Sequence, residues 1–290
     1  MIKISDSGRG LVCIHLAVFL FGFSGLFGKF LSCSPLYIVS GRTFFAALTL
    51  LVYASWFSKT KLSGFTKKQI FFFTVQGILL AAHWTCFFIS IQISSVAVGL
   101  VTFSSFPLFV TFLEPFFFKE PLKTADILAA CAVFAGIVLV IPDFDFSHNI
   151  TKGGFYGIAS GLTFALLALV NRRNARESDS IAIAFYQNIF ACCFLIIPCI
   201  LTKGPVPVLS DLPYLIVLGV ACTALAHTLF IKSLAYIKAQ AAAVISGLEP
   251  VYGIVFAFLL INEIPTMRTL AGGAVIIGTT VLTGLLSKDR

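Results

Sequence analysis

The sequence predicts an all-α membrane protein in which ten transmembrane helices form two inverted five-helix repeats around a central cavity. Of its 290 residues, 59% are hydrophobic and 11% are charged, whereas soluble domains have roughly 45–50% apolar and about 25% charged residues. The apolar residues fall into ten runs, and the two halves of the chain match at a constant spacing. We therefore expect one membrane domain, with a first repeat at 1–141, an external linker at 142–153 and a second repeat at 154–290.

Ten apolar runs are long enough to cross the hydrocarbon core, which is about 30 Å thick and requires about 20 helical residues. We predict helices at 11–31, 36–57, 70–93, 96–118, 125–141, 154–171, 180–201, 212–232, 240–261 and 268–286. The first run has no cleavage motif of the kind that ends a signal peptide, so we expect it to be the first helix. Several connections are only a few residues long, which makes consecutive helices antiparallel neighbours.

The distribution of lysine and arginine predicts the orientation, because cytoplasmic loops are enriched in these residues. With a cytoplasmic N-terminus, 15 of the 20 Lys and Arg residues face the cytoplasm, and four (Lys29, Lys152, Lys203 and Arg268) face the other side. Arg42 alone lies well inside a run. We therefore expect a multi-pass protein of the cell (inner) membrane with both termini in the cytoplasm, which requires an even number of spans.

Charge, cysteine content and motifs exclude several classes of function. The net charge of +8 arises from residues at the ends of the apolar runs, so it reflects membrane topology, and we expect no nucleic-acid partner. The 8 cysteines lie in or beside apolar runs without paired loop spacing, which predicts neither disulfides nor a metal site. The sequence contains no P-loop, H-E-x-x-H or G-x-S-x-G motif, so we expect no cofactor, no catalytic residues and no enzyme activity.

The two halves of the chain match, without a gap, when 143 is added to a residue number in the first half. The matched pairs are Phe21/Phe164, Thr85/Thr228, Phe87/Phe230, Ser90/Ser233, Val101/Val244, Pro107/Pro250 and Glu120/Glu263. Five predicted helices separate the two copies. Since five is odd, the second copy must lie inverted in the membrane relative to the first. Inverted repeats are typical of secondary transporters, in which two related halves form inward-open and outward-open states around one central site.

Several motifs occupy equivalent places in the two halves. The fourth predicted helix opens with SSVAVGL and ends near Glu120, and the ninth opens with IKAQAAAVISGLEP and ends near Glu263. The third and eighth contain HWTCFFISI and HTLFIKSLAYIK. Together with Arg42 in the second helix, these motifs resemble the drug/metabolite transporter superfamily, in its EamA-type branch. The resemblance implies a helical basket whose cavity is lined chiefly by helices 1, 3, 4, 6, 8 and 9, and transport of amino acids, amines, nucleotide-linked metabolites or drugs.

Charged residues within apolar helices are costly, and they mark candidate binding positions. Glu249 lies near the middle of the ninth helix, immediately before Pro250. It is either a cavity carboxylate that recognises a cation or carries a proton, or a structural carboxylate that hydrogen-bonds a neighbouring helix. Its repeat mate is the apolar Phe106, which we expect near the same cavity. Arg42 either binds a carboxylate or acts at a gate, or it extends toward the external face.

Aromatic and amide side chains form a second group of candidate binding residues. Trp84 and its repeat mate His227 lie at corresponding depths, and His83 precedes Trp84. A central site with stacking and cation–π capacity needs such groups, although packing between helices with one hydrogen bond would also explain each of them. A histidine could also couple transport to protons, because imidazole titrates near neutral pH. Tyr186, Gln187 and Asn188 form a polar patch in the seventh helix, and we assign Tyr186 and Asn188 to the cavity.

A third group of residues is assigned to helix ends and gates. Glu114 lies near the cytoplasmic end of the fourth helix, where it can pair with a basic residue. Glu120 and Glu263 follow equivalent helices at opposite membrane faces, which indicates end caps or a pair of gates. Pro107 and Pro250 each remove a backbone hydrogen bond from an apolar run, so we assign them to the scaffold of the repeat.

We expect a secondary transporter, without an ATP site, that moves a small metabolite by alternating access, with an amino acid or organic amine as the leading substrate class. The alternative is a nucleotide- or sugar-linked metabolite or a drug, although such anions favour more basic residues than Arg42 alone. A non-transporting receptor or an intramembrane enzyme is the alternative from another class. The expected partners are the metabolite, the lipid bilayer and protons as a candidate coupling ion, in a monomer or a homodimer.

Overall fold

The computed structural model is entirely helical in its regular structure over the residues that it describes, which are 6–119, 124–141 and 145–288. Eight helical stretches are long and apolar enough to cross a membrane. They are Gly8–Phe30, Pro35–Trp56, Lys67–Ile93, Val96–Phe118, Asn149–Asn174, Ser180–Leu201, Leu209–Leu234 and Ala241–Ile261. These stretches correspond to eight of the ten predicted runs, and they confirm a helical, multi-pass membrane protein.

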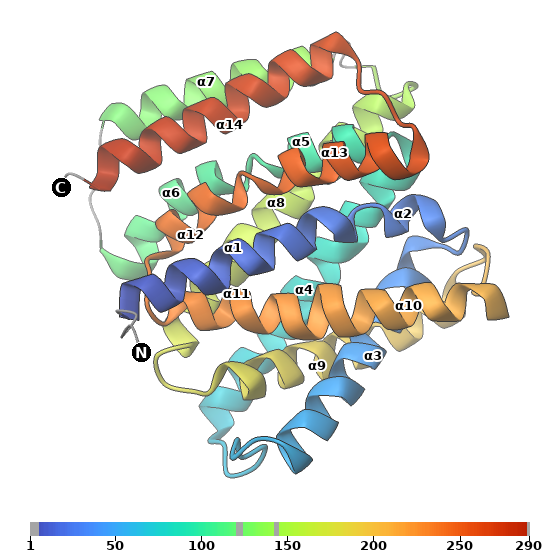
Figure 1. Ribbon diagram of the computed structural model, residues 1–290, viewed down its shortest axis with the longest axis vertical. Helices are drawn as coiled ribbons and strands as arrows, with labels where there is room; N and C mark the ends of the chain where they lie inside the picture. The colour runs from blue at the N-terminus through green and yellow to red at the C-terminus, as the bar shows by residue number, and fades with distance from the viewer. Residues whose placement is uncertain (1–5, 120–123, 142–144, 289–290) are drawn as a thin grey trace.

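The other two predicted runs form α7 (Thr124–Val140) and α14 (Met267–Lys288). The apolar part of α7, Ile127–Val140, is shorter than the eight stretches above. The two helices pack against each other at one edge of the molecule (Figure 1). Their backbones come close at two glycines: a Cβ on Gly136 would lie 2.9 Å from the Gly272 carbonyl oxygen, and one on Gly272 would lie 2.6 Å from that of Gly136. Small residues permit this close helix contact.

The remaining helices complete the two halves of the chain. The first half contains α1 (Asp6–Ser24), α2 (Phe27–Phe30), α3 (Pro35–Trp56), α4 (Lys67–Ile93), α5 (Val96–Phe103) and α6 (Phe106–Phe118). The second half contains α8 (Asn149–Asn174), α9 (Ser180–Leu201), the 3₁₀ turn η1 (Leu209–Asp211), α10 (Leu212–Gly219), the π-helical segment η2 (Val220–Leu225), α11 (Ala226–Leu234), α12 (Ala239–Ser246) and α13 (Glu249–Ile261). Thr66 and Gln69 form a capping box at the start of α4, which satisfies N–H groups that lack partners within the helix.

Two of the spans are broken in the middle, at corresponding positions. Residues 104–105 separate α5 from α6, and residues 247–248 separate α12 from α13. Each break is followed by a proline in the first turn of the next helix, Pro107 in α6 and Pro250 in α13. Proline is well tolerated there because the first-turn N–H groups have no partner within the helix. The breaks are 143 residues apart, so they follow the sequence repeat.

The ends of α6 and α13 also correspond. Lys119 ends α6 with a φ of 57°, and Asn262 ends α13 with a φ of 53°. Within the described part of the chain, these are the two non-glycine residues with positive φ. A left-handed residue at this place allows the chain to turn away from the helix end. The spacing between the two is again 143, so the repeat extends to backbone conformation.

Helices of the two halves pack in matching pairs. α4 packs against α8, and its counterpart α11 packs against α1; α5 and α6 pack against α8, and α12 and α13 pack against α1. Two glycines 143 residues apart permit the first pair of contacts. A Cβ on Gly153 of α8 would lie 2.6 Å from the Cβ of Ser94, and one on Gly10 of α1 would lie 2.9 Å from that of Tyr236. These four helices, α1, α4, α8 and α11, occupy the middle of the molecule (Figure 1).

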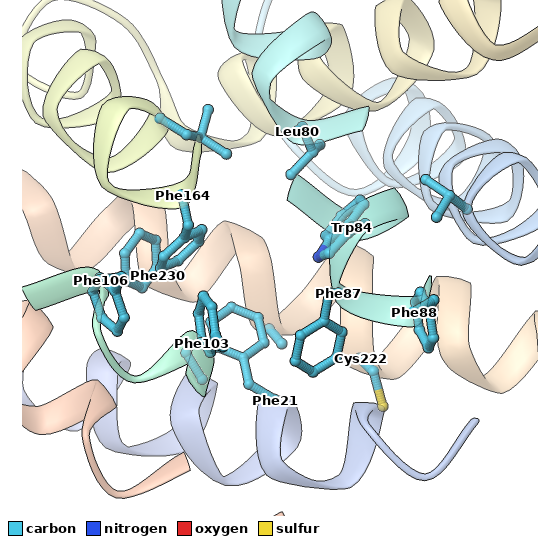
Figure 2. Close-up of a cluster of buried hydrophobic side chains, with 14 of the residues drawn as sticks. Phe21, Leu80, Trp84, Phe87, Phe88, Phe103, Phe106, Phe164, Cys222 and Phe230 are labelled. Carbon is cyan, nitrogen blue, oxygen red and sulfur yellow. The ribbon is translucent and has the colours of Figure 1, made fainter. Parts of the chain in front are cut away.

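An aromatic cluster fills the space between these central helices (Figure 2). The ring centroid of Phe106 lies 5.2 Å from that of Phe103 and 5.1 Å from that of Phe164. Phe230 extends the cluster, with its centroid 5.2 Å from Phe164 and 5.9 Å from Phe21. Rings at such separations pack favourably. This aromatic cluster forms one wall of the site described next.

Candidate functional site

A small cavity lies beside the aromatic cluster, where the central helices meet. Its volume is about 20 Å³, close to the space that one water molecule requires. The lining residues are Phe21 and Ser24 of α1, Arg42 of α3, His83, Trp84 and Phe87 of α4, Phe103 of α5, Phe164 of α8, His227 of α11 and Glu249 of α13. Both halves of the chain therefore contribute polar groups, and a metabolite-sized ligand requires the lining helices or side chains to move apart.

Arg42 is buried and held in place by the π-helical segment η2. Its Nε donates to Thr223 Oγ1 at 3.0 Å, and its Nη2 donates to the Cys222 carbonyl at 3.3 Å. π-Helical turns are rare and occur often at functional sites. The guanidinium carbon lies 3.7 Å from the centroid of the Trp84 ring, which is within the range of a cation–π interaction. Nη1 is buried without a hydrogen-bond partner, so its N–H groups can serve a ligand.

His227 stands at the end of a buried chain of polar side chains. Its Nε2 lies 2.9 Å from Gln187 Oε1. The Gln187 amide nitrogen donates to Asn171 Oδ1, and Gln76 Nε2 donates to the same oxygen at 2.9 Å. These hydrogen-bonded side chains thus link α11, α9, α8 and α4. His227 Nδ1 is buried without a hydrogen-bond partner, and the ring lies 5.6 Å from that of Trp84 in an edge-on arrangement.

His83 is held from α8. Its Nδ1 lies 3.1 Å from the backbone oxygen of Ser160 and 2.8 Å from the hydroxyl oxygen of the same residue. Its ring centroid lies 4.7 Å from that of Phe164 and 5.3 Å from that of Phe103. The aromatic cluster therefore packs on one side of the imidazole, whose second nitrogen, Nε2, makes no hydrogen bond with the described residues.

Glu249 is the first residue of α13 and follows the break in this span. The residue is 5% exposed. Its charge and that of Arg42 attract each other across the cavity, yet in the described part of the chain no hydrogen bond or ion pair joins the two. The first turn of a helix favours a negative charge, but a buried carboxylate without a hydrogen-bonding partner is costly. A ligand can supply the missing partner.

Three side chains that we assigned to the cavity from the sequence do not line it. The Tyr186 phenol donates to the Leu62 backbone oxygen at 2.6 Å, and the Asn188 amide donates to a carbonyl one turn earlier in α9. Tyr186 therefore packs toward the loop between α3 and α4, and the Asn188 amide is used in a hydrogen bond within α9. Phe106 belongs to the aromatic cluster, where its ring packs against the lining residues Phe103 and Phe164 but does not itself line the cavity.

Glu114 of α6 forms a buried ion pair with Arg172 of α8. The two residues are 3% and 4% exposed, and the Arg172 guanidinium carbon lies 4.1 Å from the Phe118 ring centroid. We expected Glu114 to pair with a basic residue near this helix end, and its partner comes from the other half of the chain. The pair ties the end of α6 to the end of α8.

Glu263 caps a helix of the other half. Its carboxylate oxygens accept hydrogen bonds from the backbone N–H groups of Val96 at 3.2 Å and Ala97 at 3.0 Å. These N–H groups belong to the first turn of α5, where an acceptor and a negative charge are both favourable. Its repeat mate, Glu120, lies outside the described residues. The observed contacts agree with a helix-end cap at Glu263.

Several residues that support the site were not predicted from the sequence. Gln76 and Asn171 are amides within apolar runs, so the cost of burying polar groups, which drew attention to Glu249, would have indicated them too. Thr223, Ser160 and Ser24 gave no such signal, because small hydroxyl residues are common in membrane helices and can hydrogen-bond their own backbone.

The fold and the cavity define a multi-pass helical membrane protein with a polar site at its centre. Comparison with protein families agrees: the model described as the EamA-like transporter family matches once in each half of the chain, at residues 8–141 and 151–285. The chain therefore belongs to the EamA-like transporter family, which confirms the resemblance found in the sequence. Family membership also indicates a transporter rather than an enzyme.

Individual relatives are more distant. The S-adenosylmethionine uptake transporter of Rickettsia bellii is 26% identical over 240 residues, covering 83% of this chain and 80% of the relative. An uncharacterized transporter of Helicobacter pylori is 28% identical over 290 residues, covering 95% and 94%. Solute carrier family 35 member G1 of Homo sapiens is 25% identical, covering 94% and 78%. A solved crystal structure superposes with a TM-score of 0.73 at 17% identity over 99% of this chain and all of the other, which supports the fold.

Proposed function

We propose that this protein is a secondary transporter of the cell (inner) membrane that moves a small metabolite, an amino acid or organic amine, by alternating access. In this proposal α7 and α14 also cross the membrane, which gives ten spans and places both termini in the cytoplasm. The family match supports transport as the activity. The 15 basic residues on one side of the predicted topology support the orientation.

The same proposal includes an inverted arrangement of the two halves. Support comes from the matching helix pairs, since α4 packs on α8 as α11 packs on α1, while α3 with α9 and α7 with α14 pair across the halves. A pseudo-twofold axis in the membrane plane generates this pattern. Two halves related in this way form inward-open and outward-open states of similar energy. The small volume of the cavity, about 20 Å³, also favours a mechanism in which helices separate to admit the substrate.

The observation that carries the substrate class is the presence of Arg42 and Glu249 in one cavity without direct pairing. A guanidinium binds carboxylates, and a buried carboxylate recognises a cation. An amino acid carries both groups, and Trp84 with the aromatic cluster offers apolar and cation–π surface for the rest of the molecule. We therefore propose an amino acid or organic amine. S-adenosylmethionine, named for the Rickettsia relatives, is an amino acid with a sulfonium and an adenine ring, and it is the first candidate to test.

The test is uptake into liposomes that contain the purified protein, with labelled S-adenosylmethionine and a panel of amino acids and amines. We expect Glu249→Gln to lower uptake by roughly tenfold or more while the protein remains folded, because one charge of the site is lost. Glu177→Gln is the matched control, since Glu177 is exposed in the loop before α9. Unchanged uptake by Glu249→Gln would remove this residue from the site, and ligand binding without flux would indicate a receptor.

A nucleotide- or sugar-linked metabolite is the alternative substrate class. Its phosphate groups need several basic partners, but Arg42 is the single lysine or arginine among the lining residues. The same uptake panel decides between the classes: transport of a nucleotide sugar, with no transport of amino acids or amines, would favour the alternative.

A further inference from the structure

Both cavity histidines use one ring nitrogen to bind a group outside the cavity. His83 Nδ1 lies 3.1 Å from the backbone oxygen of Ser160 and 2.8 Å from the hydroxyl oxygen of the same residue, and His227 Nε2 faces Gln187 Oε1. Carbonyl and amide oxygens can only accept a hydrogen bond, whereas a hydroxyl can accept or donate. A hydrogen on His83 Nδ1 satisfies both Ser160 contacts, while a bare Nδ1 would oppose the carbonyl oxygen, so we assign the hydrogen to the facing nitrogen of each ring. A neutral imidazole has one N–H donor and one acceptor nitrogen. His83 Nε2 and His227 Nδ1 are therefore the acceptors, and both rings line the cavity.

The direction of the His227 contact is set by amides farther away. Asn171 Oδ1 accepts hydrogen bonds from the amide nitrogens of both Gln187 and Gln76. With its nitrogen used in this way, Gln187 must turn its oxygen toward His227. Three helices other than α11 thus determine which nitrogen of His227 is left as an acceptor, and Nδ1 is that atom, buried without a partner.

Three acceptors belong to residues that line the cavity: His83 Nε2, His227 Nδ1 and the Glu249 carboxylate. The lining residues also carry donors, which include the Trp84 indole N–H and Arg42 Nη1, the latter buried without a hydrogen-bond partner. The described residues contain no cluster of His, Cys, Asp and Glu close enough to hold a metal ion. Metal ligands must approach to about 2.0–2.2 Å, whereas hydrogen-bond acceptors work at roughly 2.7–3.2 Å, so this arrangement suits a hydrogen-bond donor.

From this geometry we infer that His83 and His227, with Glu249, bind the primary ammonium group of the substrate, and that Gln187 is a positioning residue that presents His227 Nδ1 to it. A primary ammonium offers three N–H donors and one positive charge. Arg42 Nη1 remains for the substrate carboxylate. The inference rests on the transporter function proposed above and names the chemical group that its site recognises.

The tautomers are tested without any substrate, by nitrogen-15 NMR of histidine-labelled protein in lipid nanodiscs, where protonated and bare ring nitrogens have well-separated shifts. The chain has 4 histidines, so His83→Asn and His227→Asn variants assign the signals. We expect a bare Nε2 on His83 and a bare Nδ1 on His227. Gln187→Leu should let His227 change tautomer while the His83 signals stay the same, and Gln187→Glu, which retains an oxygen, should preserve the wild-type tautomer. The opposite tautomers, or doubly protonated rings, in the wild-type protein would overturn the inference.

The ammonium group is tested by competition against the uptake of labelled S-adenosylmethionine. If an amino acid of the panel is the better substrate, that amino acid is labelled instead. Each competitor is compared with its Nα-trimethyl derivative, which keeps the charge but has no N–H donor. We expect the trimethyl form to compete roughly tenfold more weakly or worse, because buried acceptors lose their partners. Equal competition, with uptake intact, would overturn this inference alone. Absence of uptake for every amino acid and amine would overturn the proposed function, and the ammonium site with it, whatever the tautomers are.

Discussion

At the scale of single residues, buried charges in this protein are met in two different ways. Glu114 and Arg172 pair with each other across two helices, whereas Arg42 and Glu249 line one cavity without such a pair. The desolvation cost of the first two is offset within the protein. The desolvation cost of Arg42 and Glu249 is offset only in part. Arg42 contacts Thr223, Cys222 and the Trp84 ring. A ligand that carries both a negative and a positive charge can therefore bind favourably to both residues.

The Glu114–Arg172 pair leads to a prediction about stability. Glu114→Gln removes the carboxylate that faces the buried Arg172 guanidinium. Breaking a buried ion pair costs about 3–5 kcal/mol, and we expect a clearly lower melting temperature in detergent. Replacing both partners with apolar residues, as in Glu114→Leu with Arg172→Met, should recover much of the loss. Arg176→Gln is the matched control, because Arg176 is exposed four residues beyond Arg172 and surface changes stay within about 0.5 kcal/mol. A single variant as stable as the wild type would show that the pair contributes little.

Single residues could be predicted where the signal lies in the local sequence, and not where it depends on contacts between helices. Arg42 and Glu249 were found because a charge in an apolar run is costly wherever the helix faces. Tyr186 was placed in the cavity because its depth can be estimated from the sequence, but its facing direction cannot, since α9 is apolar nearly all round. Gln187 belongs to the polar patch found in the sequence, but its contact with His227, like that of Ser160 with His83, is made between helices, and one sequence does not reveal such contacts.

At the scale of helices, glycines set the distance between neighbours. A Cβ on Gly157 of α8 would overlap the Thr102 hydroxyl and lie 3.3 Å from the Gly99 carbonyl oxygen. α8 and α5 pack directly on each other, and α8 also carries Phe164 and Ser160 into the site. The position of α8 therefore affects both stability and the cavity.

We predict that Gly157→Leu destabilises the protein by about 1–3 kcal/mol or more, because overpacking forces the two helices apart. The measurement is the melting temperature and the yield of monodisperse protein in detergent. Gly278→Ala in α14 is the matched control: nothing lies within 4 Å of its added Cβ, and alanine favours a helix over glycine by up to about 1 kcal/mol. Normal yield and melting of Gly157→Leu would contradict the close contact between α8 and α5.

Helix positions were largely predictable, while local irregularities were not. Hydropathy located the runs, but those at 96–118 and 240–261 were predicted as single helices, whereas each is broken in the structure. Pro107 and Pro250 indicated only the loss of a backbone hydrogen bond. The π-helical segment η2 had no signal of its own, since its residues Val220–Leu225 are ordinary apolar and small residues. It forms because Thr223 donates to the Leu218 carbonyl five residues earlier and accepts from Arg42, which is a contact between spans.

At the scale of the whole molecule, the repeat connects sequence, backbone and packing. The shift of 143 residues found in the sequence recurs in the two helix breaks and in the positive φ angles of Lys119 and Asn262. Matching side chains are few, and the two halves contribute different groups to the cavity. Phe106 and Glu249 show this difference, since one packs in the aromatic cluster and the other lines the cavity.

Inversion of the second half makes a topological prediction that length and hydropathy alone do not. If α7 and α14 both cross the bilayer, each half has five spans and the N- and C-termini lie on the same side. Because the basic residues are concentrated on that side, reporter fusions at both termini should show cytoplasmic activity only. A fusion in the 145–148 loop that precedes α8 should show external activity and serves as the matched control. A C-terminus on the external side would require an odd number of spans, and it would make the shorter α7, with its apolar stretch of Ile127–Val140, the first helix to reassign.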